Sequence, residues 1–388
     1  MKNIARSLIV ALAAAVLSQW GYGRYLALSD VFKNRSGHLT PVYNIKSHEI
    51  AFSDRIRNCE DLLLDEGLGV AILSCDPGRD HWNTVMGTFR ADKNLKSGKL
   101  WLYDYSHPDL EEEQLIKPLK FEDFPNENDF HPLGLELDQE TSTLYVVNHA
   151  QSGSAIEVFQ LSIREATLTY VKTYKHRLIQ APNALHSIGN GRLYVTNDHM
   201  LRAAISPLLS KIETFSGLPG GSVVYTDLND PNTTTLVARL AFANGIAMLN
   251  ANTLAVSSTS GAGVYFYEVQ PDHSLQFKSW VRTPAAIDNL SVDSNGVLLV
   301  AGHPSALDLM KVSKNRPYCK PESDIQAERE ACGCSAPSYV AQWTENYGLE
   351  TLYQGYEFCS STMMVRDVTR GVAFVSGLYE KGVMFVRE

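Results

Sequence analysis

Short runs of apolar, β-branched and aromatic residues recur along the chain, and each run ends in a small or polar residue. Six such cores lie at 70–74, 144–148, 193–197, 254–257, 297–301 and 372–376. A segment with alternating apolar and polar positions follows each core, at 100–105, 156–161, 222–227, 263–269, 307–312 and 382–387. Alternation with a period of two is typical of half-buried strands. The pattern therefore predicts six strand pairs.

Helical periodicity is sparse, and its best candidates are the short segments 58–64 and 200–214. Each of the six repeats holds enough residues for a four-stranded sheet. The repeat predicts an all-β fold, a six-bladed β-propeller over residues 51–388, preceded by an N-terminal arm at 23–50.

Oxygen-bearing side chains precede most of the cores. The positions eight to eleven residues before each core are Glu60, Leu133, Asn183, Asn244, Asp288 with Asn289, and Thr362. One Asp-Asn pair alone would indicate a turn, but equivalent positions of a propeller converge on its axis. Five of these side chains, with water, reach the six to eight oxygen ligands that calcium takes: Glu60, Asn183, Asn244, Asp288 and Asn289. The sequence thus predicts a central calcium tunnel, whereas zinc or copper would favour His or Cys.

The N-terminus carries Lys2 and Arg6 before an apolar run at 7–17, which is too short for a comfortable membrane span. Residues 1–22 are predicted to be a signal peptide or signal anchor, so the body is secreted, or luminal or extracellular and membrane-anchored. An uncleaved segment would allow membrane association. The net charge of -9 and the lack of a basic run argue against a nucleic-acid partner.

Six cysteines in a secretory chain favour disulfides. We expect one local bridge among Cys319, Cys332 and Cys334, with a zinc site at Cys332 and Cys334 as the alternative. Glycosylation sequons begin at Asn34, Asn232 and Asn289, and the last is expected to be unused because it starts a buried strand.

Five motifs, in order over residues 58–388, resemble those of the serum paraoxonase/arylesterase family. They are Val-Val-Asn-His at 146–149, Thr-Asn-Asp-His at 196–199, Phe-Ala-Asn-Gly-Ile at 242–246, Asp-Asn-Leu-Ser-Val-Asp at 288–293 and Gly-His-Pro at 302–304. The resemblance implies a six-bladed propeller with calcium in its axial tunnel, which hydrolyses lactones, aryl esters and sometimes organophosphate triesters. It also implies the same five calcium ligands.

The chain departs from that family at several positions. The family pairs two histidines to activate water. The second maps to His149, but Leu133 stands at the first, with His131 two residues earlier. The resemblance places Asp198 and His199 at the tunnel mouth. The family's C-terminal cysteine is absent, so Cys59 must pair elsewhere or stay free.

A second, buried calcium of the family maps by resemblance to Asp61, the carbonyl of Leu135 and the position of Ala184. Because Ala184 offers no carboxylate, one tightly bound calcium is predicted, and Asp61 needs another partner, such as a backbone N–H.

The expected chemistry is hydrolysis of a small lactone or ester, in which calcium polarises the carbonyl and water attacks. The general base is sought among His149, His199, His131 and Glu60; His303, which closes a strand, is also consistent with a satisfied structural histidine. A Gly-x-Ser-x-Gly nucleophile motif is absent from the sequence. The alternative is a non-catalytic, calcium-stabilised propeller that binds a ligand or protein partner, which the loss of the first dyad histidine favours.

Overall fold

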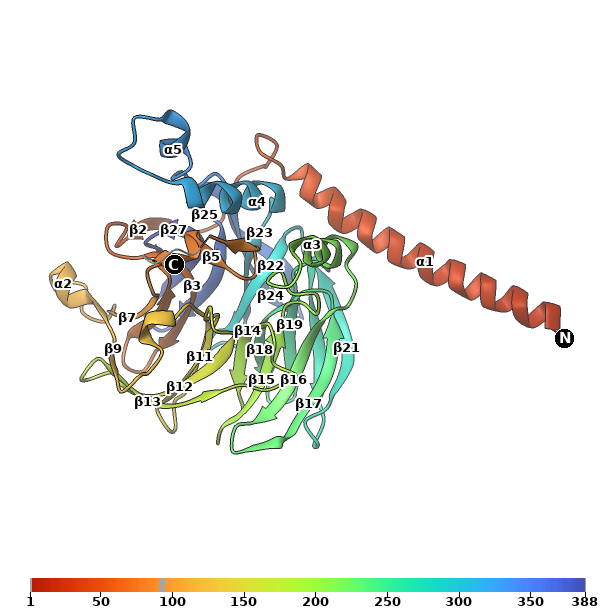
Figure 1. Ribbon diagram of the computed structural model, residues 1–388, viewed down its shortest axis with the longest axis horizontal. Coiled ribbons are helices and arrows are strands. Elements are labelled where there is room, and N and C mark those ends of the chain that lie inside the picture. The colour runs from red at the N-terminus through yellow and green to blue at the C-terminus, as the bar shows by residue number, and fades with distance from the viewer. Residues whose placement is uncertain (1, 91–94, 388) are drawn as a thin grey trace.

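The computed structural model describes residues 2–90 and 95–387, and its body consists of antiparallel sheets with a long N-terminal helix extending away from them (Figure 1). Four of the sheets are built from strands that follow one another along the chain, each strand pairing with the next. This up-and-down order is typical of propeller blades. The predicted all-β, propeller-like fold is confirmed at this level.

The first of the four sheets contains β10 (Pro132–Asp138), β11 (Thr143–Asn148), β12 (Ala155–Ser162) and β13 (Thr167–Tyr174), extended by β9 (Lys120–Glu122). The second contains β14 (Pro182–Ser187), β15 (Arg192–Asn197), β16 (Gly221–Asp227) and β17 (Asp230–Leu240). The third contains β18 (Ala243–Asn250), β19 (Thr253–Ser258), β20 (Gly263–Val269) and β21 (Leu275–Arg282). The fourth contains β22 (Ala286–Val292), β23 (Leu298–His303), β24 (Pro337–Thr344) and β25 (Gly348–Cys359), with β1 (Val42–Tyr43) at its edge.

The two ends of the body share one larger, eight-stranded sheet. Its order is β2 (Ser47–Ala51), β28 (Val383–Arg387), β27 (Val372–Lys381), β3 (Arg57–Asp65), β4 (Val70–Cys75), β7 (Lys99–Asp104) and β8 (Ile116–Pro118), while β26 (Ser361–Asp367) pairs with β27. Strands β27 and β3 meet through Gly377 opposite Cys59 and Lys381 opposite Arg57. A separate small sheet pairs β5 (Trp82–Asn83) with β6 (Thr88–Phe89).

Six strands form an inner ring, in which β3, β10, β14, β18, β22 and β26 contact one another in this order and β26 contacts β3. Every one of them has a register shift near its start. Such bulges re-aim side chains. The shifts fall at the positions that the sequence analysis selected: Glu60, Leu133, Asn183, Asn244, Asp288 with Asn289, and Thr362.

Glycine allows neighbouring ring strands to approach closely. A Cβ atom on Gly134 would lie 2.4 Å from the carbonyl oxygen of Asn183, and one on Gly245 would lie 2.5 Å from the Cα of Asn289. Further out, apolar faces of adjacent sheets pack together, as Ile72 and Leu100 do against Phe159. Burial of one such side chain stabilises the fold by about 1.5–3 kcal/mol.

All six predicted cores are strands, but two other predictions are wrong. The segment 58–64 lies in strand β3 rather than a helix, because its backbone is paired with β4 on one side and β27 on the other. The segment 307–312 lies in helix α4 (Ala306–Asn315) rather than a strand. Ser305 caps this helix, and Leu309 and Val312, three residues apart, are buried on one face.

The predicted helix in 200–214 is confirmed in part as α3 (Pro207–Ser216), capped by Ser206 and ended by Gly217 with φ 65°. Apart from the long N-terminal helix, the other helices of the described residues are short: α2 (Glu112–Leu115), α5 (Gln326–Glu330), η1 (Pro77–Asp80), η2 (Glu127–Asp129) and η3 (Arg316–Tyr318).

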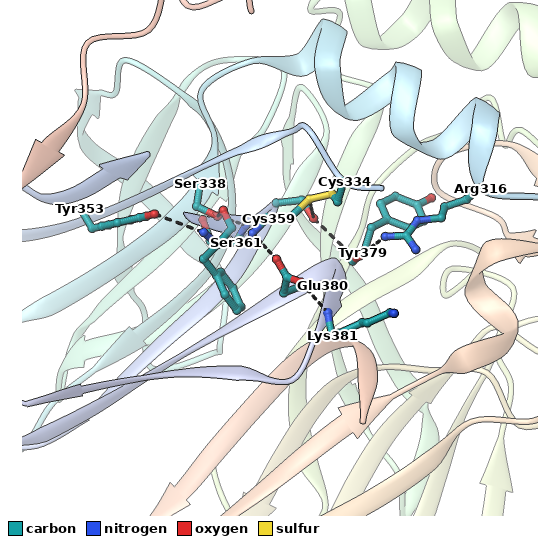
Figure 2. The surroundings of a disulfide bond; sticks show 11 residues. Arg316, Cys334, Ser338, Tyr353, Cys359, Ser361, Tyr379, Glu380 and Lys381 are labelled. Atoms are coloured by element: carbon teal, nitrogen blue, oxygen red, sulfur yellow. Dashed lines mark hydrogen bonds between the residues drawn. A yellow bond between two sulfur atoms is a disulfide. The ribbon is translucent and has the colours of Figure 1, made fainter. Parts of the chain in front are cut away.

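Three disulfides account for all six cysteines. The local Cys319–Cys332 bridge confirms the prediction, and Cys59 pairs with Cys75 on the adjacent strand. Cys334 pairs with Cys359, beside Tyr379 and Glu380 (Figure 2). The zinc alternative at Cys332 and Cys334 is wrong, because both sulfurs are used in separate disulfides.

Helix α1 (Lys2–Lys33) continues through the expected boundary at residues 22 and 23. Within residues 2–90 and 95–387, no helix has the length and apolarity needed to cross a membrane. The end of α1 lies on the body: Asp30 forms an ion pair with Arg282, and Asn34 donates a 3.0 Å hydrogen bond to the carbonyl of Pro284. The sequon asparagines Asn34 and Asn289 are buried, whereas Asn232 is exposed.

Candidate functional site

Four of the five predicted calcium ligands line one cavity at the centre of the ring, namely Glu60, Asn183, Asn244 and Asp288. The fifth, Asn289, donates a 2.9 Å hydrogen bond from its amide nitrogen to Glu60 Oε1. All five side chains are buried. The bulged strand starts therefore bring together residues that are far apart in the sequence.

Several oxygen atoms of this group lack a hydrogen-bond partner among the described residues: Glu60 Oε2, Asn183 Oδ1, Asn244 Oδ1 and Asn289 Oδ1. The amide nitrogen of Asn244 is turned toward Thr259 Oγ1 at 3.1 Å, which leaves its oxygen free. Buried polar atoms in native proteins nearly always have partners, so four orphan acceptors in one place require an explanation.

A hard cation explains these orphan acceptors. Two carboxylates and three amides match the oxygen ligands and the charge of calcium. Groups of three or more His, Cys, Asp or Glu side chains positioned for a metal are absent from the described residues. The residues present therefore fit calcium.

Burial dominates the electrostatics of the site. It raises the pKa of Glu60 well above its usual range, and the charges of Asp288 and Asp61 act in the same direction. Arg79, which also lines the cavity, opposes this rise in pKa. Its guanidinium is buried and donates a 2.7 Å hydrogen bond to the carbonyl of Pro132. The sequence analysis missed Arg79, since a single arginine in a turn carries no distinctive signal.

The cavity has a volume of about 160 Å³ and mainly apolar walls, which include Leu133, Phe242 and Val85. Helices α1, α3 and α4 form its rim. From α1 come Arg24, Ala27, Leu28 and Asp30, and Arg24 donates a hydrogen bond to the carbonyl of Ser260. The sequence analysis assigned this segment to an arm and did not connect it with the site.

His303 lines the same cavity. Its Nε2 donates a 2.9 Å hydrogen bond to Asp288 Oδ2, while its buried Nδ1 has no partner among the described residues. A neutral ring held in this way presents a free lone pair at Nδ1. The sequence contained the Gly-His-Pro motif, but a histidine that closes a strand has the same pattern whether it is structural or functional.

His149 has a different environment. Its Nε2 donates a 2.5 Å hydrogen bond to the carbonyl of Pro182, and its Nδ1 contacts the Thr84 hydroxyl. Burial lowers the pKa of His149, which favours the neutral ring. His149 is not among the described residues that line the cavity. The histidine is instead attached to the backbone beside Asn183.

His131 is buried away from the cavity lining and contacts Asp76 Oδ2 through Nδ1 at 3.1 Å. His199 contacts Asp198 at 3.0 Å and the Thr214 hydroxyl at 2.7 Å, and its ring packs on Phe242. Burial acts to lower the pKa of His199, but the hydrogen bond and charge of Asp198 outweigh it and raise the pKa. Asp198 and His199 thus support two residues of the cavity wall, Thr214 and Phe242.

Asp61 follows Glu60 directly but lines a different cavity, together with Leu135 and Ala184. Its Oδ1 accepts a 2.8 Å hydrogen bond from the N–H of Leu62, and its Oδ2 accepts a 2.7 Å bond from the N–H of Leu135. Burial raises the pKa of Asp61 to about 7, although both backbone hydrogen bonds oppose the rise. These N–H groups are partners of the kind that the sequence analysis expected for Asp61.

Comparisons with known proteins agree with this geometry. The Arylesterase family matches residues 86–328. Serum paraoxonase/arylesterase 2 of Rattus norvegicus is 31% identical over 202 residues, covering 50% of this chain and 54% of the relative. Serum paraoxonase/lactonase 3 of Oryctolagus cuniculus is 28% identical over 226 residues, covering 57% of this chain and 61% of the relative. The chain thus spans somewhat more than half the length of these relatives.

Among solved structures, a luciferin-regenerating enzyme superposes with a TM-score of 0.53 at 12% identity, covering 90% of this chain and 96% of that one. A gluconolactonase-related structure superposes with a TM-score of 0.50 at 13% identity, covering 89% and 94%. At these identities the likeness concerns the fold alone.

Proposed function

This chain belongs to the paraoxonase/arylesterase family, and from that premise we propose that it is a calcium-dependent hydrolase of lactones or aryl esters. The observation that carries the proposal is the set of four orphan oxygens on Glu60, Asn183, Asn244 and Asn289 in one buried group. In a purely structural ring these acceptors would remain without partners, and each would lower the stability of the fold by about 1–3 kcal/mol.

The proposed scaffold is a six-bladed propeller with a calcium tunnel. The ring of six first strands supports it, and so does the weak seam between β27 and β3 in the eight-stranded sheet. On this interpretation the large sheet is two blades, one of β3, β4, β7 and β8 and the other of β26, β27, β28 and β2. The second of these would be completed by a strand from the N-terminal arm.

Glu60, Asn183, Asn244, Asp288 and Asn289 would hold the calcium. The chemistry that calcium supplies when bound is Lewis-acid polarisation of the substrate carbonyl, worth several kcal/mol in the transition state. The apolar wall formed by Leu133, Val85 and Phe242 would bind the acyl or aryl part of the substrate and exclude bulk water. Before calcium binds, Arg79 would offset part of the negative charge of the two carboxylates.

We place the general base at His303 rather than at His149. His303 lines the cavity, its Nδ1 has no partner among the described residues, and Asp288 holds its other nitrogen, so Nδ1 could accept a proton from water. Both ring nitrogens of His149 are engaged within the protein. His149 would then act as a positioning residue, since its bond to Pro182 fixes the backbone next to Asn183.

The partner implied is a small lactone or ester. The three disulfides are typical of an oxidising compartment and support a secretory location. The exposed Asn232 is the sequon best placed to carry a glycan. If the N-terminal segment is retained, it would provide membrane association.

A second function, ligand binding without catalysis, is favoured by Leu133 at the family's first dyad position. One experiment separates the two functions. The purified chain is assayed on a panel of lactones and aryl esters, before and after removal of metal with a chelator, and again after calcium is restored. We expect hydrolysis that is lost with chelator and recovered with calcium. Calcium binding without turnover of any substrate would favour the binding protein, and turnover that survives chelation would contradict the calcium mechanism.

A further inference from the structure

A third cavity, of about 340 Å³, lies between the η1 turn and the disulfide-linked segment at Cys319. Its lining is rich in basic groups: Arg57, Lys96, Arg316 and His81, with Asp80 as the carboxylate. The chain as a whole has a net charge of -9. A local excess of positive charge in an acidic protein marks a place where an anion would be stabilised.

Asp80 cannot neutralise this group alone. Its Oδ2 forms an ion pair with Arg57, and its Oδ1 accepts a 3.1 Å hydrogen bond from Asn58. Both oxygens of Asp80 are therefore used, while Arg316 and Lys96 add further positive charge to the cavity lining.

Arg316 is the buried part of the cluster, with 2% of its surface exposed. One of its terminal nitrogens donates to the carbonyl of Tyr379, an arrangement that Figure 2 shows, but its Nε has no partner among the described residues. The Nε of Arg57 likewise has no partner there. A buried guanidinium with free donors is costly unless a ligand completes its hydrogen bonds.

A second carboxylate that influences Arg316 electrostatically, Glu380, is also engaged. Glu380 accepts hydrogen bonds from the backbone N–H groups of Cys359, at 2.6 Å, and Lys381, at 2.8 Å (Figure 2). It therefore has no strong need of Arg316. Burial lowers the pKa of Arg316, the charge of Asp80 opposes this change, and the charge of Arg57 adds to it. A bound anion would act in the same direction as Asp80.

We propose that this cavity binds a small divalent oxyanion, such as a sulfate or phosphoryl group, between Arg57, Arg316 and Lys96. Guanidinium groups match tetrahedral oxyanions through paired, charge-assisted hydrogen bonds. The site does not depend on the hydrolase function. Among the described residues, none lines both this site and the central cavity. Strand β3 and the η1 turn contribute to both, since Glu60 and Arg79 line the central cavity whereas Arg57 and Asp80 line the oxyanion site.

The test uses the full chain and sodium sulfate, with sodium chloride at equal ionic strength as the salt control. Isothermal titration calorimetry and thermal unfolding should show saturable binding and a rise in Tm with sulfate that chloride does not produce. Lys96→Gln should weaken sulfate binding about tenfold, because it removes one charge-assisted contact. Lys96 is exposed, so this variant should fold, and Lys99→Gln is the matched control, since Lys99 is exposed and lies outside the lining.

Arg57→Gln should weaken binding at least as much as Lys96→Gln, and a phosphate monoester should compete with sulfate if the natural ligand is larger than a free ion. Failure of the ester to compete would indicate a free inorganic anion at the same site. If the parent and Lys96→Gln bind sulfate with equal affinity, the proposal is overturned. Sulfate binding in the central cavity would give this result. The absence of any sulfate effect beyond that of chloride would overturn the proposal as well.

Discussion

Glu60 and Asp61 are consecutive residues of strand β3, both buried and both carboxylates, yet their environments are opposite. Glu60 lines the central cavity, and its Oε2 has no hydrogen-bond partner among the described residues. Asp61 lines a different cavity, and both its oxygens accept backbone hydrogen bonds. The register shift between Cys59 and Asp61 separates the two. Burial of a carboxylate therefore does not by itself indicate a metal site, and the proposed calcium site rests instead on several unpaired oxygens in one buried group.

The same contrast recurs on strand β14. Asn183 carries an orphan oxygen in the central cavity, while its neighbour Ala184 lines the cavity of Asp61 and offers no oxygen ligand from its side chain. Three of the four orphan acceptors belong to residues that line the central cavity, whereas Asn289, which bonds Glu60, lines the cavity of Asp61. In that cavity the carboxylate of Asp61 is paired with the backbone.

The largest expected effect comes from breaking the unpaired group. Asn244→Ala or Asp288→Ala should lower kcat/KM by a thousandfold or more, because several kcal/mol of carbonyl polarisation depend on the ligand set. Asp61→Asn should lower kcat/KM by about tenfold at most, mainly because it makes the folded protein less stable. Kinetics on the best substrate, with circular dichroism to verify folding, checks this order. Full activity in either Ala variant would remove calcium from the mechanism.

Two histidines extend the comparison. His303→Asn removes the free nitrogen in the cavity and should lower kcat by about a hundredfold, the usual contribution of a general base. His149→Asn should have a smaller effect on kcat and should weaken calcium affinity, since His149 supports the backbone beside Asn183. Kinetics at saturating calcium separates these effects. If His149→Asn gives the larger loss of kcat there, the base is His149.

Metal content sharpens the same contrast. The parent should hold one tightly bound calcium after desalting, Glu60→Gln should lose it, and Asp61→Asn should keep it. The Asp61→Asn variant should still lose about 1–3 kcal/mol of unfolding free energy. An amide has one oxygen, so it cannot replace both carboxylate oxygens as acceptors of the two backbone hydrogen bonds. Elemental analysis and denaturant unfolding measure both quantities. Two tightly bound ions in the parent, the second lost in Asp61→Asn, would show that Asp61 is a ligand despite Ala184.

The smallest effect concerns the rim above Glu60. Arg24→Gln should raise KM about a few-fold for substrates long enough to reach α1, because Arg24 lines the cavity. The value of kcat should be almost unchanged, because Arg24 is not one of the proposed calcium ligands. Arg35→Gln, on the exposed stretch after the helix, serves as the control. A change in kcat as large as the change in KM for Arg24→Gln would mean that the rim also affects the geometry of the proposed calcium ligands.

The strand repeat allowed the fold class to be predicted, and it selected residues that line one cavity, because Glu60, Asn183, Asn244 and Asp288 share one place in each repeat. Other features depend on contacts that no local pattern encodes. The approach of Arg24 to Ser260, and the free nitrogen of His303, arise only when distant segments meet.

The two secondary-structure errors have local causes. Segment 307–312 is a short apolar run, and such runs fit a strand or a helix equally well until a cap such as Ser305 decides. Segment 58–64 spans the bulge at Glu60, and an extra residue in a strand disturbs its period of two.

Strand β2, from the arm before the ring, pairs along its whole length with β28, near the other end of the chain. During synthesis, β2 must therefore wait until β28 has emerged before it finds its neighbour. Until then its unpaired edge and that of β27 are open to other chains, and exposed edges promote aggregation. A cell that makes this protein should need to guard the nascent chain with chaperones, and a premature stop codon just before residue 383 should be far more harmful than the loss of so few residues suggests.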